Sequence, residues 1–326
     1  MISVIIPAYN IEEYIGECME SVLAQSGVEM EIIVVDDGST DATPAIVDDF
    51  ARRHGHIKVI HRTNGGLAAA RNTALEHCTG DWITMVDGDD LLMPGALALM
   101  LKAANDTEAD MVMGAFADFT NVAPAALASA DGSATTTATT IISGRQAVET
   151  MLYRRGPTAT VHSSAWGKLY RRELWEHHTF KAGILYEDLE VVPRISLNAR
   201  RVAVVDDIVY AYRYNSNSIL HVFTPNRLDV IDVARSLVAH FVGDKPLHRA
   251  AESRLFSAAF NMWLLLVVNH ADMPDKLAEC KRIVRHLAPG QIFRSKVRFK
   301  NRIGAILQYF PFLFRSAGIC KKLLPK

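Results

Sequence analysis

The first 120 residues alternate between short apolar runs and segments of helical periodicity, and this alternation restricts the fold more than any other feature. The apolar runs are expected to form strands at residues 3–9, 31–37, 57–62, 81–87 and 109–119. The segments between them are expected to form helices at residues 11–25, 43–55, 65–80 and 93–106. A strand–helix series of this kind builds a mostly parallel sheet flanked by helices. The sequence therefore predicts a Rossmann-like α/β fold.

Polar residues follow each of the first four predicted strands. They are "YN" at 9–10, "DDGST" at 36–40, "HRTNGG" at 61–66 and "DGDD" at 87–90. In sheets of this class, ligands bind beyond the carboxyl ends of the strands. Four polar clusters at one edge predict a binding site there, and Asn10 is expected to cap the first helix.

The "DGDD" cluster places three like charges around Gly88, directly after an apolar strand. Their mutual repulsion is unfavourable unless a positive charge lies among them. Hard divalent cations prefer carboxylate oxygens, so Asp87 and Asp89 are candidate metal ligands. An acidic turn in front of a helix explains the same pattern, and the cluster alone does not separate the two interpretations.

Two further clusters suggest contacts with a nucleotide. Asp37 follows the second strand, where its carboxylate can accept hydrogen bonds from a base or a ribose. Arg71 lies one turn into the third helix, between alanines, and needs a partner. That partner is a surface carboxylate, a nucleotide or Asp37. The surrounding "NGGLAAARN" has neither the P-loop pattern nor the dinucleotide-binding pattern.

Beyond residue 120 the alternation is less regular. Residues 121–143 are rich in Ala, Ser and Thr and are expected to form an exposed loop or a weak hairpin. A helix is expected to begin near Asp188 and to kink or restart at Pro193. Residues 201–214 are expected to carry two strands. The last hundred residues are expected to be helical, with helices near 226–241, 246–270 and 274–287.

At this point five ordered motifs resemble those of the family-2 glycosyltransferases of the GT-A fold. They are "VIIPAYN", "VVDDGSTD", "NGGLAAARN", "DGDD" and "YEDLE", and the resemblance covers about residues 1–220. It implies a GT-A catalytic domain over 1–220, with a nucleotide-sugar half at about 1–120 and an acceptor half at about 141–220. A helical C-terminal region over 221–326 follows, with a basic amphipathic tail.

The resemblance also implies an activity. The expected enzyme is a metal-dependent, inverting glycosyltransferase that moves a sugar from a UDP-sugar to a glycan or lipid-linked saccharide acceptor. Within the family, the resemblance is to bacterial enzymes that build capsule, exopolysaccharide or lipopolysaccharide, or that decorate teichoic acid. The implied substrate-binding residues are Pro7, Ala8, Tyr9, Asn10, Asp37, Asn64, Gly66, Arg71, Asp87, Gly88, Trp166, Lys168, Glu187 and Arg213.

Within that set the resemblance assigns individual roles. Asp37 reads the uracil, Arg71 lies near the base, and Trp166 and Lys168 shape the acceptor or pyrophosphate site. Core packing is the alternative for Trp166. Arg213 meets either a phosphate or a surface acid.

The resemblance implies that Asp87 points toward the ribose and that Asp89 binds Mn²⁺ or Mg²⁺, with Asp87 as a second ligand. His221 is a further candidate ligand, although a lone His is more often structural. Asp188 is the implied catalytic base, and the alternative is that Glu187 or Asp188 only caps a helix. Near a helix N-terminus the Asp188 carboxylate is expected to stay ionised.

The C-terminal tail is strongly basic. Of the 35 Lys and Arg residues, twelve lie between Cys280 and Lys326, where there is no Asp or Glu. Residues 296–310 are expected to form a helix with cations beside an apolar stripe, which suits an anionic membrane surface. The alternatives are packing on the catalytic domain and homo-oligomerisation. Nucleic acid is not an expected partner, because no recognised binding module accompanies the basic residues.

The expected location is the cytoplasm, peripheral to the inner face of the cell membrane. The four cysteines lie far apart, as in a reduced protein without a zinc site. No uncharged apolar stretch reaches the ~20 residues that a spanning helix needs. Two other functions stay open. One is a non-catalytic nucleotide-sugar-binding subunit, and the other is a nucleotidyltransferase, although the basic Gly-rich loop of that class is missing near the first strand.

Overall fold

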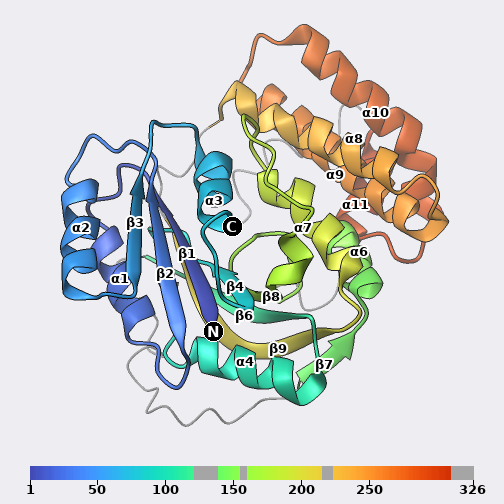
Figure 1. Cartoon of the computed structure of the whole chain (residues 1–326). Helices are drawn as coiled ribbons and strands as arrows, with labels where there is room; N and C mark the ends of the chain where they lie inside the picture. The colour runs from blue at the N-terminus through green and yellow to red at the C-terminus, as the bar shows by residue number, and fades with distance from the viewer. Residues whose placement is uncertain (121–138, 155–159, 215–222, 310–326) are drawn as a thin grey trace. The chain divides into compact units, whose positions relative to one another are not determined.

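The structure is a computed structural model that describes residues 1–120, 139–154, 160–214 and 223–309 (Figure 1). The chain divides into two compact units. The first comprises residues 1–148 and 157–216, and the second comprises 149–156 and 217–326. The main division thus falls next to the boundary expected at residue 220. The segment 149–156 groups with the helical unit, which the sequence did not indicate.

Four strands of the first unit are parallel neighbours. They are β1 (Ile2–Ala8), β2 (Met30–Asp36), β3 (Ile57–His61) and β4 (Trp82–Met85). The order is β3-β2-β1-β4, so the carboxyl ends of all four strands lie at one edge of the sheet. The predicted α/β fold is confirmed, and the four polar clusters follow strands that share this edge.

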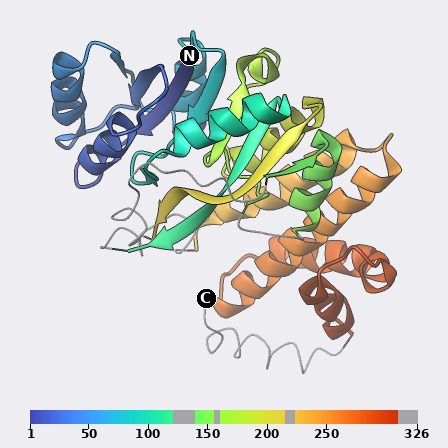
Figure 2. The same cartoon turned by 90° about the horizontal axis from the view of Figure 1, so that it is seen from below.

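The rest of the sheet is mixed. Its strands are β5 (Leu91–Leu92), β6 (Met111–Phe119), β7 (Thr139–Ile142), β8 (Lys168–Arg171) and β9 (Val202–Arg213). β8 lies between β4 and β6 and runs antiparallel to both. β6 and β9 run side by side in parallel, whereas β5 and β7 pair with β9 in the antiparallel sense (Figure 2). The mostly parallel arrangement therefore describes β1–β4 and the β6–β9 pair.

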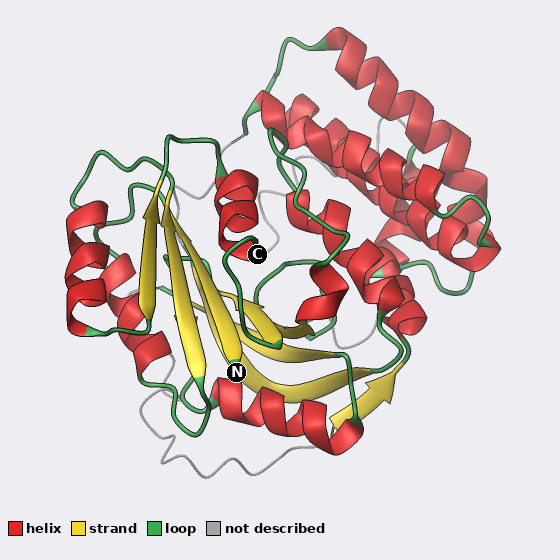
Figure 3. Ribbon diagram, in the orientation of Figure 1, coloured by secondary structure: helices red, strands yellow, loops and turns green. Residues whose placement is uncertain are grey.

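Helices cover both faces of the parallel strands (Figure 3). α1 (Ile15–Leu23), α2 (Thr43–Arg53) and α4 (Ala96–Thr107) share one apolar core with the strands. α3 (Leu67–Leu75) contacts β1 and β2 and carries Arg71. α3 ends five residues before the predicted end at Gly80.

The first helix does not begin where the sequence indicates. Residues 11–14 form turns, and Tyr14 occupies the cap position of α1. Asn10 has a φ of 49°, and its side-chain oxygen accepts a hydrogen bond from the backbone N–H of Thr40 at 2.8 Å. The predicted capping role of Asn10 is therefore wrong, because its side chain joins the first two polar clusters instead.

Two more local predictions in the first unit need correction. α7 (Glu187–Asn198) begins next to Asp188 as predicted but runs without interruption through Pro193. β9 is one continuous strand, where two strands were predicted. In α7 the residues around Pro193 are buried, and in β9 the pairing with β6 continues from Val202 to Arg213 with a register shift near the predicted break. These tertiary contacts prevail over the local signal. The described residues before position 214 also form α6 (Gly144–Tyr153), which spans the division after Val148, and the 3₁₀ turn Arg172–Trp175.

The second unit is helical in its described part, as predicted. After a 3₁₀ turn at Pro225–Leu228 come α8 (Asp229–His240), α9 (Lys245–Val268), α10 (Pro274–Phe293) and α11 (Phe299–Leu307). α9 packs against α8, α10 and α11. α10 continues through Pro289 and Gly290, six residues beyond the predicted end.

α9 has the length and composition of a membrane-crossing helix, and among the described residues it is the single such segment. Of its 18-residue apolar window, 67% is buried inside the structure. Core helices of globular proteins share this composition, and the contacts of α9 with three neighbouring helices are those of a core helix.

Candidate active site

The first three polar clusters are joined by hydrogen bonds at the carboxyl edge of the sheet. The backbone N–H of Asn10 donates to Ser39 Oγ at 3.0 Å, and that of Arg62 donates to the Asp36 carbonyl at 3.0 Å. These bonds connect the residues that follow β1, β2 and β3. The prediction that the clusters lie together is therefore confirmed.

Asp37 holds the glycine loop that precedes α3. Its carboxylate accepts hydrogen bonds from Arg62 Nη1 at 2.8 Å, from the N–H of Gly65 at 3.1 Å and from the N–H of Gly66 at 2.7 Å. The residue is buried, whereas Asn64 and Gly66 are exposed. Asp37 thus fixes the loop that would surround a base. Sequence reasoning did not select Arg62, although it lies within the cluster "HRTNGG".

The predicted nucleoside-lining segment is only partly accessible. Pro7 and Ala8 are the buried end of β1. Tyr9 is 49% exposed and Asn10 is exposed, so these two residues are the ones that a nucleoside could contact.

Asp90 is a positioning residue in the acidic turn. It is buried, and its carboxylate accepts hydrogen bonds from the Tyr210 hydroxyl at 2.8 Å and from the Arg213 N–H at 2.7 Å. The Tyr210 hydroxyl oxygen in turn accepts a hydrogen bond from the Asp87 N–H at 3.1 Å. The turn is therefore tied to β9 on both sides of Asp89.

Asp87 and Asp89 differ in how their charge is compensated. Arg71 Nη2 donates to Asp87 Oδ1 at 2.6 Å, whereas Asp89 has no ion-pair partner in the described part of the chain. Burial and the charge of Asp87 raise the pKa of Asp89 to about 6. A bound cation would remove this repulsion, so the two carboxylates fit a hard divalent metal ion.

A cation at this turn would need ligands besides these two carboxylates. The described residues contain no group of three or more His, Cys, Asp or Glu side chains that could enclose a metal ion. Diphosphate oxygens and water would complete the coordination, as is usual for Mg²⁺. His221, the third candidate ligand, lies outside the described residues.

Gly88 lets the acidic turn approach the end of β1. A Cβ atom at this position would lie 2.4 Å from Ile11 Cδ1 and 3.0 Å from the Pro7 carbonyl oxygen. The backbone oxygen cannot move without disturbing the sheet, so a side chain larger than hydrogen displaces the turn.

We predict that Gly88→Ala lowers the free energy of unfolding by ~1–3 kcal/mol, because the added methyl group overpacks this contact. Gly16→Ala is the matched control. Gly16 lies in α1, where an added methyl group would have no atom within 4 Å, and the change is expected to be neutral or to stabilise by up to ~1 kcal/mol. Urea denaturation measures both variants, and equal effects would contradict the steric explanation.

Arg71 joins the acidic turn to the N-terminus of α7. Its Nη1 donates to Glu187 Oε1 at 2.7 Å, and its Nη2 contacts Asp87 as described. The side chain is 3% exposed, and its guanidinium lies 5.2 Å from the centre of the Phe180 ring. Neither Asp37 nor an exposed surface acid is its partner, so these two predicted alternatives are wrong.

Glu187 and Asp188 form the acidic start of α7. Burial raises the pKa of Glu187 to about 7, while the adjacent Arg71 lowers it. Burial also raises the pKa of Asp188, against the stabilising effect of the helix N-terminus on an anion. The charges of Asp87 and Asp188 interact, so the acidic turn and the start of α7 belong to one electrostatic site.

Lys168 and Trp166 are buried beside this site. Lys168 Nζ donates to the Ser164 carbonyl at 2.7 Å and lies 3.1 Å from His162 Nδ1. Burial lowers the pKa of Lys168 well below its usual value, and the charge of Asp188 raises it. Trp166 stacks on Tyr210 with ring centres 4.5 Å apart. Core packing, the alternative for Trp166, is the role that this geometry gives.

Arg213 contacts a surface acid. Its Nη2 donates to Glu17 Oε2 at 2.6 Å, and its Nε donates to the carbonyl oxygen of Asp89 at 2.7 Å. The guanidinium also lies over the rings of Tyr14 and Phe119. Arg213 therefore braces the acidic turn from the side of α1.

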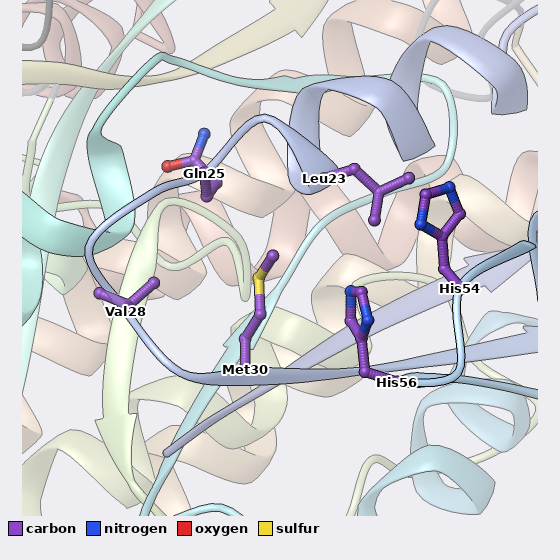
Figure 4. Close-up of a pocket in the computed structure, with 6 residues that line it drawn as sticks. All are labelled: Leu23, Gln25, Val28, Met30, His54 and His56. Carbon is purple, nitrogen blue, oxygen red and sulfur yellow. The ribbon is translucent and has the colours of Figure 1, made fainter.

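A separate hollow of about 370 Å³ lies at the opposite edge of the parallel strands (Figure 4). It is lined by Leu23, Gln25, Val28, Met30, His54 and His56, and Met30 is the first residue of β2. None of the predicted site residues lines it. It is therefore distinct from the acidic site at the carboxyl edge.

Comparisons with known proteins place the chain among glycosyltransferases. The sequence model of Glycosyl transferase family 2 matches residues 3–177, more than half of the chain. The uncharacterized glycosyltransferase EpsJ of Bacillus subtilis is 32% identical over 311 residues, which cover 91% of this chain and 86% of EpsJ. Glycosyltransferase GlyG of Streptococcus pneumoniae is 30% identical over 227 residues, or 68% of this chain and 73% of GlyG.

Among solved structures, residues 1–349 of S. aureus TarS in complex with UDP-GlcNAc share the fold. The TM-score is 0.67 at 20% identity, with 94% of this chain and 89% of that chain covered. The resemblance seen in the sequence motifs is thus confirmed by the family match and by the GT-A fold. The chain belongs to glycosyltransferase family 2.

Proposed function

We propose that this protein is an inverting, metal-dependent glycosyltransferase that transfers a sugar from a UDP-sugar to a glycan or lipid-linked saccharide. The observation that carries the proposal is the Arg71 bridge, which holds Asp87 of the acidic turn together with Glu187, next to Asp188. In this proposal the acidic turn is the place for a diphosphate-bound cation, and Asp188 is a separate carboxylate for proton transfer.

The donor class is supported by the fold and by the accessible residues. TarS, which has the same fold, was solved with UDP-GlcNAc and with UDP. In this chain Tyr9, Asn10 and the loop held by Asp37 would surround the nucleoside, and Asp37 would act on the uracil through the position of that loop. Asp89 and Asp87 would hold Mn²⁺ or Mg²⁺. When bound, that cation neutralises charge on the departing diphosphate as a Lewis acid.

The proposed reaction is a single displacement at the anomeric carbon. A hydroxyl oxygen of the acceptor bonds to this carbon from the face opposite the diphosphate, and the bond to the diphosphate oxygen breaks. The hydroxyl proton passes to Asp188, and UDP leaves with inversion at the carbon. The raised pKa of Asp188 makes it a stronger base than an exposed aspartate, which suits this role.

The acceptor is proposed to be a saccharide of bacterial surface polysaccharide. Support comes from relatives named for such polymers, including a chondroitin synthase of Escherichia coli that is 41% identical over 101 residues, or 31% of this chain. The proposal covers capsule, exopolysaccharide, lipopolysaccharide and teichoic acid synthesis.

The test is UDP release from a panel of UDP-sugars with Mn²⁺. We expect Asp89→Asn to lower the rate by about 10²-fold or more, the size of effect seen when one electrostatic stabiliser is removed. Asp106→Asn is the matched control, because it removes an exposed carboxylate that pairs with Lys102 on the surface. An unchanged rate in Asp89→Asn would show that Asp89 has no role in the reaction.

Two further measurements separate the alternative functions. Binding of UDP-sugars without release under any condition would indicate a non-catalytic nucleotide-sugar-binding subunit. Release of pyrophosphate from a nucleoside triphosphate would indicate a nucleotidyltransferase.

A further inference from the structure

α11 has three large apolar side chains on the outside, whereas small residues and Leu307 face the core. Its buried residues include Asn301, Gly304 and Ala305. Its exposed residues include Phe299 at 77% and Ile306 at 46%. This distribution is the reverse of that in an ordinary surface helix, whose large apolar side chains face the core.

The inner contacts fix the rotation of α11 about its axis. A Cβ atom at Gly304 would lie 2.9 Å from the Phe260 ring of α9, so only glycine permits this distance. The Asn301 side chain donates to the Ser253 carbonyl of α9 at 3.3 Å. Turning the helix to bury Phe299 would separate these contacts and bring a larger residue against Phe260.

The outward side chains form a continuous stripe. Phe299, Ile303 and Ile306 recur at spacings of four and three residues, which places them on one face of the helix. Tyr309, 60% exposed, lies two residues after the end of the helix. We call these four residues the outer α11 face. Apolar side chains gathered in this way mark a surface that contacts a partner.

The positive charge of the sequence around the outer α11 face indicates which kind of partner it contacts. From Cys280 onward the chain has twelve Lys and Arg residues and no acid. Arg282 and Arg285 of α10 are exposed and have no ion-pair partner among the described residues. A second copy of this surface would carry the same positive charge and be repelled. The same holds for residues 310–326, which contain Lys and Arg but no Asp or Glu. The complementary partner is therefore anionic at its surface and apolar beneath.

We propose that the outer α11 face docks on an anionic lipid bilayer. Phe299, Ile303, Ile306 and Tyr309 insert between the acyl chains, and the exposed Arg282 and Arg285 of α10 contact the headgroups. This arrangement holds the helical unit at a membrane surface without a spanning helix. It does not depend on the proposed function of the first unit.

The test uses the full chain and sedimentation with vesicles of phosphatidylcholine containing 30% phosphatidylglycerol. We expect the double variant Phe299→Ser, Ile306→Ser to weaken binding at least tenfold. Both side chains are exposed, so the fold is retained, and circular dichroism checks this. Val242→Ser is the matched control, because Val242 is 73% exposed on the same unit but outside the outer α11 face. Its binding is expected to equal that of the unchanged protein.

Vesicles of pure phosphatidylcholine and 0.5 M NaCl are each expected to reduce binding, because the headgroup contacts are electrostatic. UDP release without vesicles is expected to be the same in all variants, which separates this proposal from the catalytic one. The proposal is overturned if the protein does not sediment with anionic vesicles or if the double variant binds as well as the control. It is also overturned if the double variant instead converts a dimer to a monomer in analytical ultracentrifugation while lipid binding is absent.

Discussion

Asp188→Asn is expected to lower the rate of sugar transfer, and of donor hydrolysis in which water replaces the acceptor, by about 10²–10⁴-fold. The amide has nearly the same shape but cannot accept the hydroxyl proton. The Leu189 N–H donates to Asp188 Oδ1 at 2.6 Å, and an asparagine side-chain oxygen can accept the same bond. The start of α7 should therefore keep its structure, and the loss should appear in kcat while UDP still binds.

Two measurements make this result specific. UDP binding, followed as a rise in melting temperature, is expected to be unchanged in Asp188→Asn. Asp275→Asn is the matched control, because it removes a carboxylate from the first turn of another helix, α10. A full rate in Asp188→Asn would rule out the assignment of Asp188 as base, and an equal loss in Asp275→Asn would point to a general effect of charge.

Arg71→Ala is expected to lower the free energy of unfolding by ~3–5 kcal/mol at pH 7.5, because it leaves the buried Glu187 and the half-buried Asp87 without their cation. Arg71 contacts Asp87 and Glu187 at once and is 3% exposed. Arg52→Ala is the matched control. Arg52 pairs with Asp49 on the surface, and its loss is expected to cost ~0–1 kcal/mol. Urea denaturation measures both.

The penalty of Arg71→Ala is expected to depend on pH. The raised pKa of Glu187, about 7, means that the folded state holds a proton that the unfolded state releases above about pH 4.5. The stability contributed by Glu187 therefore falls as pH rises from about 4.5 to 7. The charge of Arg71 lowers the pKa of Glu187, so the pKa of Glu187 is expected to rise further in Arg71→Ala. The deficit should be larger at pH 7.5 than at pH 5, and an equal deficit at both values would contradict an electrostatic origin.

The sequence indicates the parallel half of the sheet and its functional edge because both depend on local signals. Strand periodicity and the polar residues after each strand can be recognised from about ten consecutive residues. The partners at that edge are not local. Arg71 and Glu187 are 116 residues apart, and the Asp90 carboxylate meets Tyr210 across 120 residues. Nothing in the motif that contains Arg71 specifies an acid on a distant helix.

Short segments explain the remaining differences. β8 has four residues and β5 has two, which is too short for periodicity to distinguish a strand from a turn. The role of Asp37 illustrates a second limit. Its motif marks it as functional, but only the structure reveals that three donors already occupy its carboxylate. For α11 the sequence gives a basic helix with an apolar stripe, whereas the packing of Gly304 decides which face points outward.

The reversed direction of β8 has a consequence for how such an enzyme can diversify. Because β8 runs antiparallel to β4, its first residue, Lys168, lies at the edge where the parallel strands end. The chain thus leaves that edge after Met85 and returns to it at Lys168, and Thr84 Oγ1 donates to the Lys168 carbonyl at 2.8 Å to close the path. The segment between Met85 and Lys168 therefore has its two ends anchored side by side. Changes of length in the loops of this segment would leave the spacing of β4 and β8 unchanged, whereas changes at its start would act directly on the acidic turn Asp87–Asp90.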